Sequence, residues 1–322
     1  MKDHDDIAAI HTPVMLDRVV ALVAPALDHE GAVYVDGTLG MGGHAEAVLR
    51  ACPGARLIGF DRDADAIEIA SARLAPFGER VRTVHAVYDE LADRLDDLGV
   101  ERIDAAFFDL GVSSLQLDEA ERGFSYMRDA PLDMRMDRQH GETAAEVLAA
   151  LGERELRDLF HRYGDEKLAG RYAAAIVAAR AEAPIRTTGR LVEILQAATP
   201  AARRNSGHPA KRVFQALRIR VNGELDALEA ALPQAMDRLR VGGRLVVEAY
   251  QSLEDRFVKR TFADACESSA PRDLPFVPEE MQPRFRLLTR GAEQAPDEEA
   301  NLNPRAKPVR LRAIERIRSR NA

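Results

Sequence analysis

The sequence predicts an α/β fold in which a doubly wound parallel sheet is interrupted by a helical domain. Three observations support this prediction. Strand and helix patterns alternate up to about residue 110, strand patterns are missing from about 115 to 199, and the alternation then resumes. A chain of 322 residues is long enough for two domains. We expect residues 1–115 and 215–322 to form the sheet domain and residues 116–214 to form the helical insertion, whose role would be substrate recognition.

The first part of the chain contains four short apolar segments that read as buried strands. Amphipathic segments lie between them, which implies right-handed crossovers and a parallel sheet covered on both faces. The expected strands cover residues 33–35, 56–60, 81–85 and 103–110, and the expected helices cover residues 43–51, 64–74 and 90–98.

The insertion is expected to be helical. Thr143 and Glu146 form a capping-box pattern that opens one helix, and Pro184 and Pro200 separate later ones. Those later helices are expected over residues 153–163, 165–183 and 188–198.

The last part returns to the sheet. Leucines between residues 225 and 239 predict a helix that Pro233 breaks or kinks, and Gly242 and Gly243 predict a turn into the next strand. The remaining expectations are strands over residues 244–249, 284–289 and 309–316, a helix over residues 253–265 and a polar loop over residues 293–303.

Composition restricts the class of protein. A net charge of −8 argues against a wholly basic nucleic-acid binder, and no apolar run is long enough to span a membrane. No secretory signal is visible. Cys52 and Cys266 match neither a disulfide framework nor a zinc spacing, so we expect a reducing, cytoplasmic location and no metal site.

Basic residues nevertheless concentrate in two segments. Residues 203–220 contain six basic and no acidic residues, and residues 302–322 contain seven basic residues against Glu315 alone. A codon bias toward arginine explains the arginine content equally well, and either segment alone is compatible with a solvated tail. Together the two segments suggest a confined surface that faces a polyanion.

A glycine-rich turn, Asp36-Gly-Thr-Leu-Gly-Met-Gly-Gly-His44, follows the first expected strand. Its glycines would let the backbone approach a ligand, and residues 40–45 also satisfy the dinucleotide pattern G-x-G-x-x-G/A. A tight turn without a ligand would need the same glycines. Asp61 ends the next strand, where a carboxylate can accept hydrogen bonds from two ribose hydroxyls. The turn and Asp61 favour an adenosine-bearing cofactor, and leave both NAD and S-adenosylmethionine open.

The segment Asp109-Leu-Gly-Val-Ser-Ser114 follows the fourth strand, at the edge of the sheet where ligands bind. We therefore expect Asp109 to face the reacting end of the cofactor. A dehydrogenase would typically need a Tyr–Lys pair or a histidine placed to transfer a proton to a carbonyl, and neither pattern occurs in this region. A carboxylate beside glycine and hydroxyl groups suits an amine acceptor instead.

A series of short motifs, which occur in a fixed order along the chain, indicates a known protein family. The motifs are HTPVML (11–16), DGTLGMGGH (36–44), FDRD (60–63), DLGVSS (109–114), QLD (116–118), ERGFSY (121–126), PLDMRMD (131–137), HPAKR (208–212), FQALRI (214–219), VN (221–222), SLEDR (252–256) and NPRA (303–306). With them, the chain closely resembles the RsmH (MraW) family of bacterial small-subunit ribosomal RNA cytosine-N4 methyltransferases over about residues 11–316.

The resemblance implies a class I (Rossmann-like) S-adenosylmethionine-dependent methyltransferase sheet with a helical insertion. It implies methyl transfer from S-adenosylmethionine to the exocyclic N4 of a cytidine in the decoding (peptidyl-site) region of small-subunit (16S) ribosomal RNA. Carried over position by position, the cofactor contacts would be Gly42, Gly43, His44, Asp61, Tyr88, Asp109 and Gln116.

The chain departs from the family pattern at four places. Tyr88 replaces the usual Phe, and its ring would flank adenine equally well. Leu115 replaces the usual Pro, which predicts a less rigid loop. Residues 249–251 read Ala-Tyr-Gln where the family has Ser-Phe-His, so we assign no general base at Gln251. Lys307 and Pro308 replace a serine-containing stretch, a change that we expect to be harmless.

Cytosine N4 is a poor nucleophile because its lone pair is delocalised, but it is uncharged and needs no strong base, and the sulfonium methyl is already activated. Catalysis on this acceptor is therefore expected to depend mainly on positioning. Asp109 is the first candidate to accept the N4–H hydrogen bond. A backbone carbonyl within residues 109–113 is the alternative, with Asp109 then bonding the amino-acid end of the cofactor.

The substrate is expected to be an unstacked or flipped base in an assembled or nearly assembled small subunit. Core packing is an equally good explanation for each aromatic candidate, and a salt bridge for each basic one. The candidates for RNA contact are Phe124, Tyr126, Arg135, Lys211, Arg212 and Tyr250. A homodimer stays open. The competing functions are an NAD-dependent oxidoreductase and a non-catalytic ribosome-assembly factor that binds RNA, which would predict loss of Asp61 or Asp109.

Overall fold

The computed structural model describes residues 13–203, 207–268, 270–271, 276 and 278–319, and these form two compact units. The sheet unit comprises the described residues up to Gly111 and those from Asp226 onward, and the helical unit is Val112–Leu225. The range predicted from the sequence for the helical insertion was residues 116–214. The helical unit continues past residue 214 because Phe214 and Leu217 are buried in its core.

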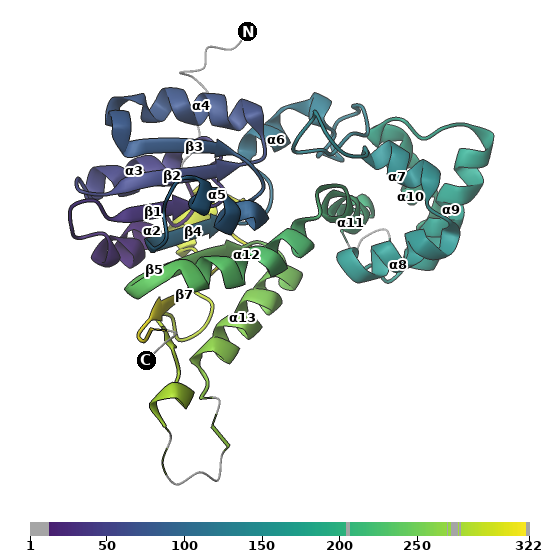
Figure 1. The fold of residues 1–322 in the computed structure, drawn as a ribbon. Helices are drawn as coiled ribbons and strands as arrows, with labels where there is room; N and C mark the ends of the chain where they lie inside the picture. Colours follow the sequence, from purple (N-terminus) through teal and green to yellow (C-terminus); the bar gives the residue numbers. More distant parts are fainter. Residues whose placement is uncertain (1–12, 204–206, 269, 272–275, 277, 320–322) are drawn as a thin grey trace. The chain divides into compact units, whose positions relative to one another are not determined.

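A seven-stranded sheet organises the sheet unit, in the order β3-β2-β1-β4-β5-β7-β6 (Figure 1). The parallel pairing expected among the first four strands is confirmed, β5 pairs parallel with β4, and β7 runs antiparallel to both of its neighbours. The strands are β1 (Val33–Asp36), β2 (Arg56–Asp61), β3 (Val81–His85), β4 (Ile103–Asp109), β5 (Leu239–Ala249), β6 (Phe285–Leu287) and β7 (Arg310–Arg316).

Helices cover both faces of the sheet, and the alternation of side chains along each strand explains why (Figure 1). Phe107 points to one face and Phe108 to the other, and both are fully buried. The first face packs against α2 (Leu16–Val23), α3 (Gly43–Ala51) and α4 (Ala64–Leu74). The second face packs against α5 (Leu91–Asp97), α12 (Glu224–Arg238) and α13 (Ser252–Cys266). Burial on both faces accounts for the apolar runs that predicted these strands.

The structure corrects part of each of three local predictions in the last part of the chain. Helix α12 continues through Pro233, so the predicted break is absent and the alternative of a kink stays a prediction. The helix buries apolar residues on both sides of the proline, including Leu228 and Met236. Gly242 and Gly243 lie within the bounds of β5, but the register against β4 shifts between Leu239 and Arg244, and regular pairing resumes at Arg244, where the strand was predicted to begin. The expected polar loop contains a short helix, α14 (Asp297–Leu302), whose first turn is acidic.

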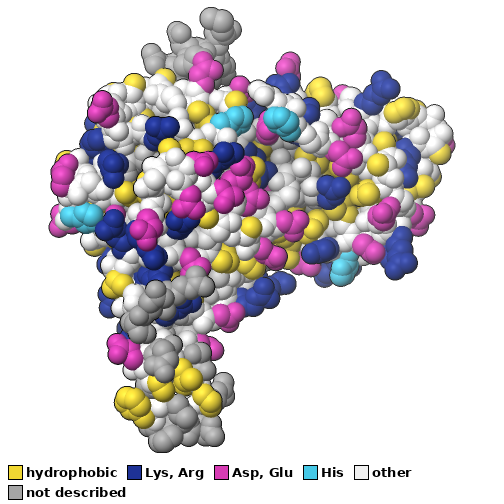
Figure 2. All heavy atoms as spheres, in the orientation of Figure 1, with side chains coloured by type: hydrophobic (Ala, Val, Ile, Leu, Met, Phe, Trp, Pro, Cys, Tyr) yellow, Lys and Arg dark blue, Asp and Glu magenta, His cyan; other side chains and the backbone are white. Residues whose placement is uncertain are grey.

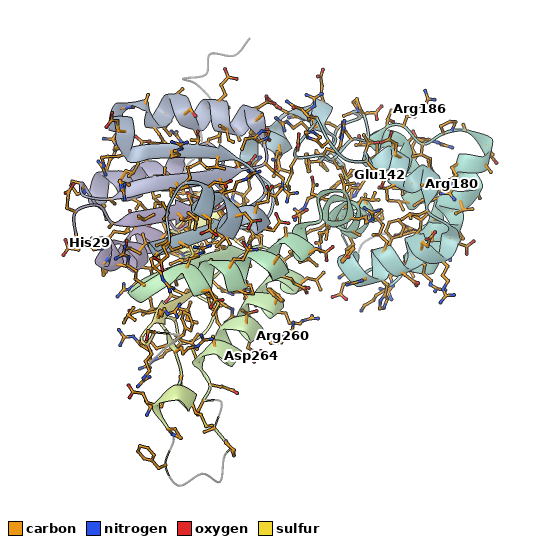
Figure 3. The ribbon with its side chains drawn as sticks, in the orientation of Figure 1. His29, Glu142, Arg180, Arg186, Arg260 and Asp264 are labelled. Carbon is orange, nitrogen blue, oxygen red and sulfur yellow. The ribbon has the colours of Figure 1, made fainter. Side chains whose placement is uncertain are left out.

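The helical unit contains no strand among its described residues, apart from a single bridge between Pro131 and Thr187. The capping box expected at Thr143 is present, since its hydroxyl accepts from the Glu146 N–H at 3.2 Å and the Glu146 carboxylate accepts from the Thr143 N–H at 2.8 Å. Arg180, labelled in Figure 3, donates from α9 to the carbonyl of Leu148 in α7.

The helices of this unit are α6 (Ser114–Asp118), α7 (Ala144–Ala150), α8 (Glu153–Gly164), α9 (Ala169–Glu182), α10 (Thr188–Ala198) and α11 (Ala210–Asn222). Short 3-10 turns complete the two units: η1 (Ala24–Ala26), η2 (Ala75–Arg80), η3 (Tyr88–Glu90), η4 (Ala120–Arg122), η5 (Ala201–Arg203) and η6 (Glu279–Met281).

Candidate cofactor site

The glycine-rich turn joins β1 to α3, and its glycines serve different purposes. Gly40 (φ +52°) and Gly42 (φ +77°) adopt left-handed backbone conformations that glycine tolerates without steric cost. A Cβ on Gly43 would lie 2.5 Å from the ring of Pro13, so the packing of the chain itself requires that glycine. A Cβ on Gly40 would meet nothing closer than the Thr38 carbonyl oxygen at 3.9 Å. Gly40 therefore leaves space beside the backbone for a ligand.

Asp61 ends β2 and holds the turn in place. One carboxylate oxygen accepts from the N–H of Gly40 at 2.7 Å, and the other accepts from the N–H of Asp63 at 2.9 Å. Burial raises the pKa of the Asp61 carboxyl to about 6. Each oxygen keeps a further lone pair, so the carboxylate is fixed beside the turn with capacity to accept hydrogen bonds from a ligand.

Tyr88 lies just beyond β3, in η3, at the same edge of the sheet as Asp61. Its half-buried ring packs edge-on against Phe108, with the ring centroids 5.6 Å apart and the planes at 76°. The turn, Asp61 and Tyr88 thus come from the carboxyl ends of three neighbouring parallel strands, which is where open α/β sheets bind nucleotides.

His44 and Asp109 lie together next to this turn. The Nε2 atom of His44 lies 2.8 Å from the carbonyl oxygen of Val14, so Nε2 carries the proton and Nδ1 is an acceptor. Burial lowers the pKa of His44 to about 4, and the ring is therefore neutral at neutral pH. Nδ1 lies 4.0 Å from the Asp109 carboxylate, and the Asp109 N–H is fixed by the Thr38 hydroxyl at 2.6 Å. Two neighbouring acceptors at this place suit a ligand that donates N–H groups.

Two buried acids at the same edge were missed by the sequence reasoning. Asp36 ends β1, is 1% exposed, and has its pKa raised to about 8 by burial and by the nearby Asp109 and Asp61 carboxylates. Glu248 in β5 is fully buried and lies opposite Asp109 in the parallel register. The available signal for Glu248 was a single acid within an otherwise apolar run, residues 245–249.

Gln116 lies in the helical unit and is buried, at 4% exposure. Its side-chain oxygen accepts from the N–H of Ser113 at 3.1 Å, and the Ser113 hydroxyl accepts from the N–H of Gln116 at 3.3 Å. These two bonds form a capping box at the start of α6. They order the segment that follows β4.

The aromatic candidates for RNA contact differ in their surroundings. Phe124 is 7% exposed and packs in the core of the helical unit, which favours the packing role over base stacking. Tyr126 is half-buried and stacks on His208, with the ring centroids 4.5 Å apart. Tyr250 belongs to the sheet unit, where its hydroxyl donates to Glu248 at 3.3 Å.

The basic candidates of the helical unit also differ. Arg135 forms a two-pronged ion pair with Asp133, through contacts of 2.8 and 2.9 Å. Arg212 is exposed and donates to the Asp165 carbonyl, and Lys211 is exposed. Lys211 and Arg212 therefore remain the basic candidates whose side chains face solvent.

Two arginines of the basic segment at 302–322 do not contribute to the polyanion-facing surface that the sequence suggested, whereas Arg305 and Lys307 of the same segment are exposed. Arg312 pairs with Asp255 at 2.8 Å, and Arg316 is 2% exposed and donates to the carbonyls of Met236 and Asp237. These arginines hold β7 to its neighbours. Figure 2 shows acidic side chains gathered over α5, so the face in view is not uniformly basic either.

No group of three or more His, Cys, Asp or Glu side chains among the described residues is placed to hold a metal ion. No described helix combines the length and the apolar character that crossing a membrane would require.

A seven-stranded sheet with a reversed seventh strand, and a glycine turn followed by a carboxylate at the next strand end, define a class I methyltransferase fold. The MraW methylase family model matches residues 8–317, and the chain belongs to this family. Its methyl donor is S-adenosylmethionine.

Relatives of this chain are named ribosomal RNA small subunit methyltransferase H. The protein of Clavibacter michiganensis subsp. michiganensis is 61% identical over 313 residues, covering 97% of this chain and 98% of the relative. The Leifsonia xyli protein is 60% identical over 316 residues, covering 98% and 97%. The Beutenbergia cavernae protein is 59% identical over 313 residues, covering 97% and 94%.

Proposed function

We propose that this chain methylates the exocyclic N4 of a cytidine in the decoding region of small-subunit (16S) ribosomal RNA, with S-adenosylmethionine as methyl donor. The names of its relatives support small-subunit ribosomal RNA as the substrate. The observation that carries the choice of an amino group is the pair of neighbouring acceptors, the Asp109 carboxylate and Nδ1 of His44.

The residues of the sheet unit fit the cofactor. The backbone at Gly40 has open space beside it, and Asp61 is fixed with lone pairs to spare for the ribose hydroxyls. The ring of Tyr88 offers a flat apolar surface for adenine. Gly42, Gly43, His44 and Asp109 complete the proposed contacts of the sheet unit, and Gln116 of the helical unit stays a contact that only the family resemblance implies. When bound, S-adenosylmethionine supplies a methyl group activated by its sulfonium sulfur.

Methyl transfer to N4 requires little acid or base catalysis. Cytosine N4 is uncharged at neutral pH and needs no deprotonation before it reacts, so the chain mainly has to hold it in line. In this proposal the Asp109 carboxylate accepts one N4–H and favours the partly pyramidal nitrogen of the transition state. The proton leaves to solvent afterwards. His44 is neutral and hydrogen-bonded to Val14, so it does not act as a cation that competes for the Asp109 carboxylate.

The helical unit would supply contacts to RNA. Lys211 and Arg212 are the proposed phosphate contacts, and Tyr126, backed by His208, is the proposed ring for stacking. Arg135 is already paired with Asp133, so we propose for it a role in shaping the loop. Because Lys211 and Arg212 are the only two proposed basic contacts that are exposed, we propose that the substrate is an assembled or nearly assembled subunit and not naked RNA.

The test is methyl transfer from labelled S-adenosylmethionine to small subunits that lack the modification. The Asp109→Asn variant should lower kcat by about 10²–10³, which is the usual cost of losing one transition-state contact of this kind. Its cofactor affinity should stay near wild type if Asp109 serves N4–H, and should fall if Asp109 holds the amino-acid end of the cofactor. Asp264→Asn, an exposed position on α13 labelled in Figure 3, is the matched control.

Tight cofactor binding without transfer to subunits or to naked RNA would contradict the proposal. Equal efficiency on naked RNA and on subunits would contradict only the proposed form of the substrate.

A further inference from the structure

Glu248 is a buried acid that the methyl-transfer mechanism does not use. It lies in β5 at 0% exposure, and in the parallel register its neighbour on β4 is Asp109. Paired residues of adjacent strands point to the same face, so the two carboxyl groups lie on one side of the sheet. One oxygen of Glu248 accepts from the Tyr250 hydroxyl at 3.3 Å. The other oxygen, Oε1, is buried and has no hydrogen-bond partner among the described residues.

Acids on two other elements act on Glu248, and its partner on β7 is the apolar Leu311. Asp109 on β4 and Glu299 on α14 act on its charge, and both disfavour its ionised form. Tyr34 and Asp36 on β1 belong to the same electrostatic cluster, because Asp36, Asp109 and Glu248 all raise the pKa of the Tyr34 hydroxyl. His44, on α3, is neutral at neutral pH and supplies no compensating charge.

An ionised carboxylate in such a place would be costly, because a buried charge without a partner loses its hydration. Burial, with Asp109 and Glu299 adding to it, raises the pKa of Glu248 well above its ordinary value. The hydrogen bond from Tyr250 lowers it only in part. In the cofactor-free protein, burial and the neighbouring acids therefore favour the protonated form of Glu248.

We propose that Glu248 is a positioning residue that holds a proton beside Asp109 in the cofactor-free protein and releases it to solvent when a cationic ligand binds at Asp109. The inference rests on the proposed function, in which Asp109 accepts N4–H and the cofactor binds in the same site. The cationic ligand is then S-adenosylmethionine, bound beside Asp109 with its positively charged end near this carboxylate. Its ammonium and sulfonium groups favour the ionised form of a nearby carboxyl. On ligand binding, the neutral carboxyl group of Glu248 becomes a carboxylate, and one proton passes to the buffer.

Two consequences follow from this linkage. Cofactor affinity should rise with pH, by up to about tenfold per pH unit, in the window between the bound and free pKa of Glu248. S-adenosylhomocysteine lacks the sulfonium charge, so its binding should release fewer protons than binding of S-adenosylmethionine. Glu248 would thereby help the protein to prefer methyl donor over product.

The experiment is isothermal titration calorimetry of the full chain with each of the two ligands, in buffers of different ionisation enthalpy from about pH 6 to about pH 9. The wild type should release up to about one proton on binding S-adenosylmethionine. Glu248→Gln copies the neutral carboxyl and keeps the acceptor for Tyr250, so it should bind with less proton release and a flatter pH dependence. Asp264→Asn should behave as wild type.

A second variant tests the inference in case the Glu248→Gln protein does not fold. Tyr250→Phe removes the hydroxyl that stabilises ionised Glu248, and should move the proton release to higher pH. Asp36 and Asp61 also titrate in or near this range, with pKa values of about 8 and about 6, and they are common to wild type and variant. The difference between the two proteins therefore isolates Glu248.

Unchanged proton release in Glu248→Gln, with cofactor still bound, would overturn the inference and leave the proposed function intact. Failure of the wild type to bind S-adenosylmethionine at any pH would overturn the proposed function, and with it the inference.

Discussion

The buried carboxyl of Asp36 predicts that the cofactor-free protein loses stability as the pH rises. Asp36 is 1% exposed, and its pKa is raised from 3.8 to about 8, mainly by burial. The folded protein thus binds a proton more tightly than the unfolded chain. Its contribution to stability is fully present below pH 3.8 and is lost as the pH rises through about 8. A shift of about four pKa units corresponds to roughly 6 kcal/mol over the whole window.

Asp36→Asn removes this titration while keeping the shape of the side chain. The Asn oxygen can still accept from the N–H of Thr38, a bond of 3.1 Å in the wild type. The free energy of unfolding of the variant should fall less with pH, and its gain over wild type should grow by up to about 1.4 kcal/mol per pH unit between pH 5 and pH 8.

Urea unfolding of both proteins at a series of pH values, followed by circular dichroism, measures this difference. Asp264→Asn serves as the exposed control and should follow the wild type. If the unfolding free energies of Asp36→Asn and wild type run parallel across the window, Asp36 does not hold a proton in the folded state and the reasoning fails.

Four further predictions follow. In scanning fluorimetry, S-adenosylhomocysteine should raise the melting temperature of the protein and NAD should not. If only NAD raised it, the result would favour the hypothesis of an NAD-dependent oxidoreductase. Gly43→Ala should destabilise the apo protein because its Cβ would lie 2.5 Å from the Pro13 ring, whereas Gly40→Ala should cost only about 1–2 kcal/mol and chiefly weaken cofactor binding in calorimetry. Cofactor affinity should fall below about pH 6, where Asp61 takes up a proton, and this fall should vanish in Asp61→Asn. Phe124→Ala should lower the free energy of unfolding by about 3–5 kcal/mol in urea titrations, because Phe124 is buried. A change near zero would favour contact with RNA as the role of Phe124.

The parallel core of the fold could be predicted because each strand and helix carries its own periodic pattern. These patterns also predict where each strand ends. Because Asp61 and Asp109 stand at the ends of two such strands, they could be placed at the edge of the sheet where ligands bind. Local chemistry also predicted the capping box at Thr143, because its two hydrogen bonds depend only on residues three apart.

What could not be predicted depends on tertiary contacts. Pro233 does not break α12, because burial of the helix outweighs the lost hydrogen bond. Arg316 looked like part of a basic surface, yet it is buried against carbonyl groups contributed by α12. Glu248 could be recognised as a buried acid only once its neighbour on β4 was known, since pairing across the sheet leaves no mark in the local sequence.

The measurement that tests the central proposal most directly is mass spectrometry of the nucleosides from small subunits treated with this protein and labelled S-adenosylmethionine. The proposal predicts label in N4-methylcytidine, at a single cytidine of the decoding region. Label in C5-methylcytidine, in a ribose-methylated nucleoside or in any other base would contradict it.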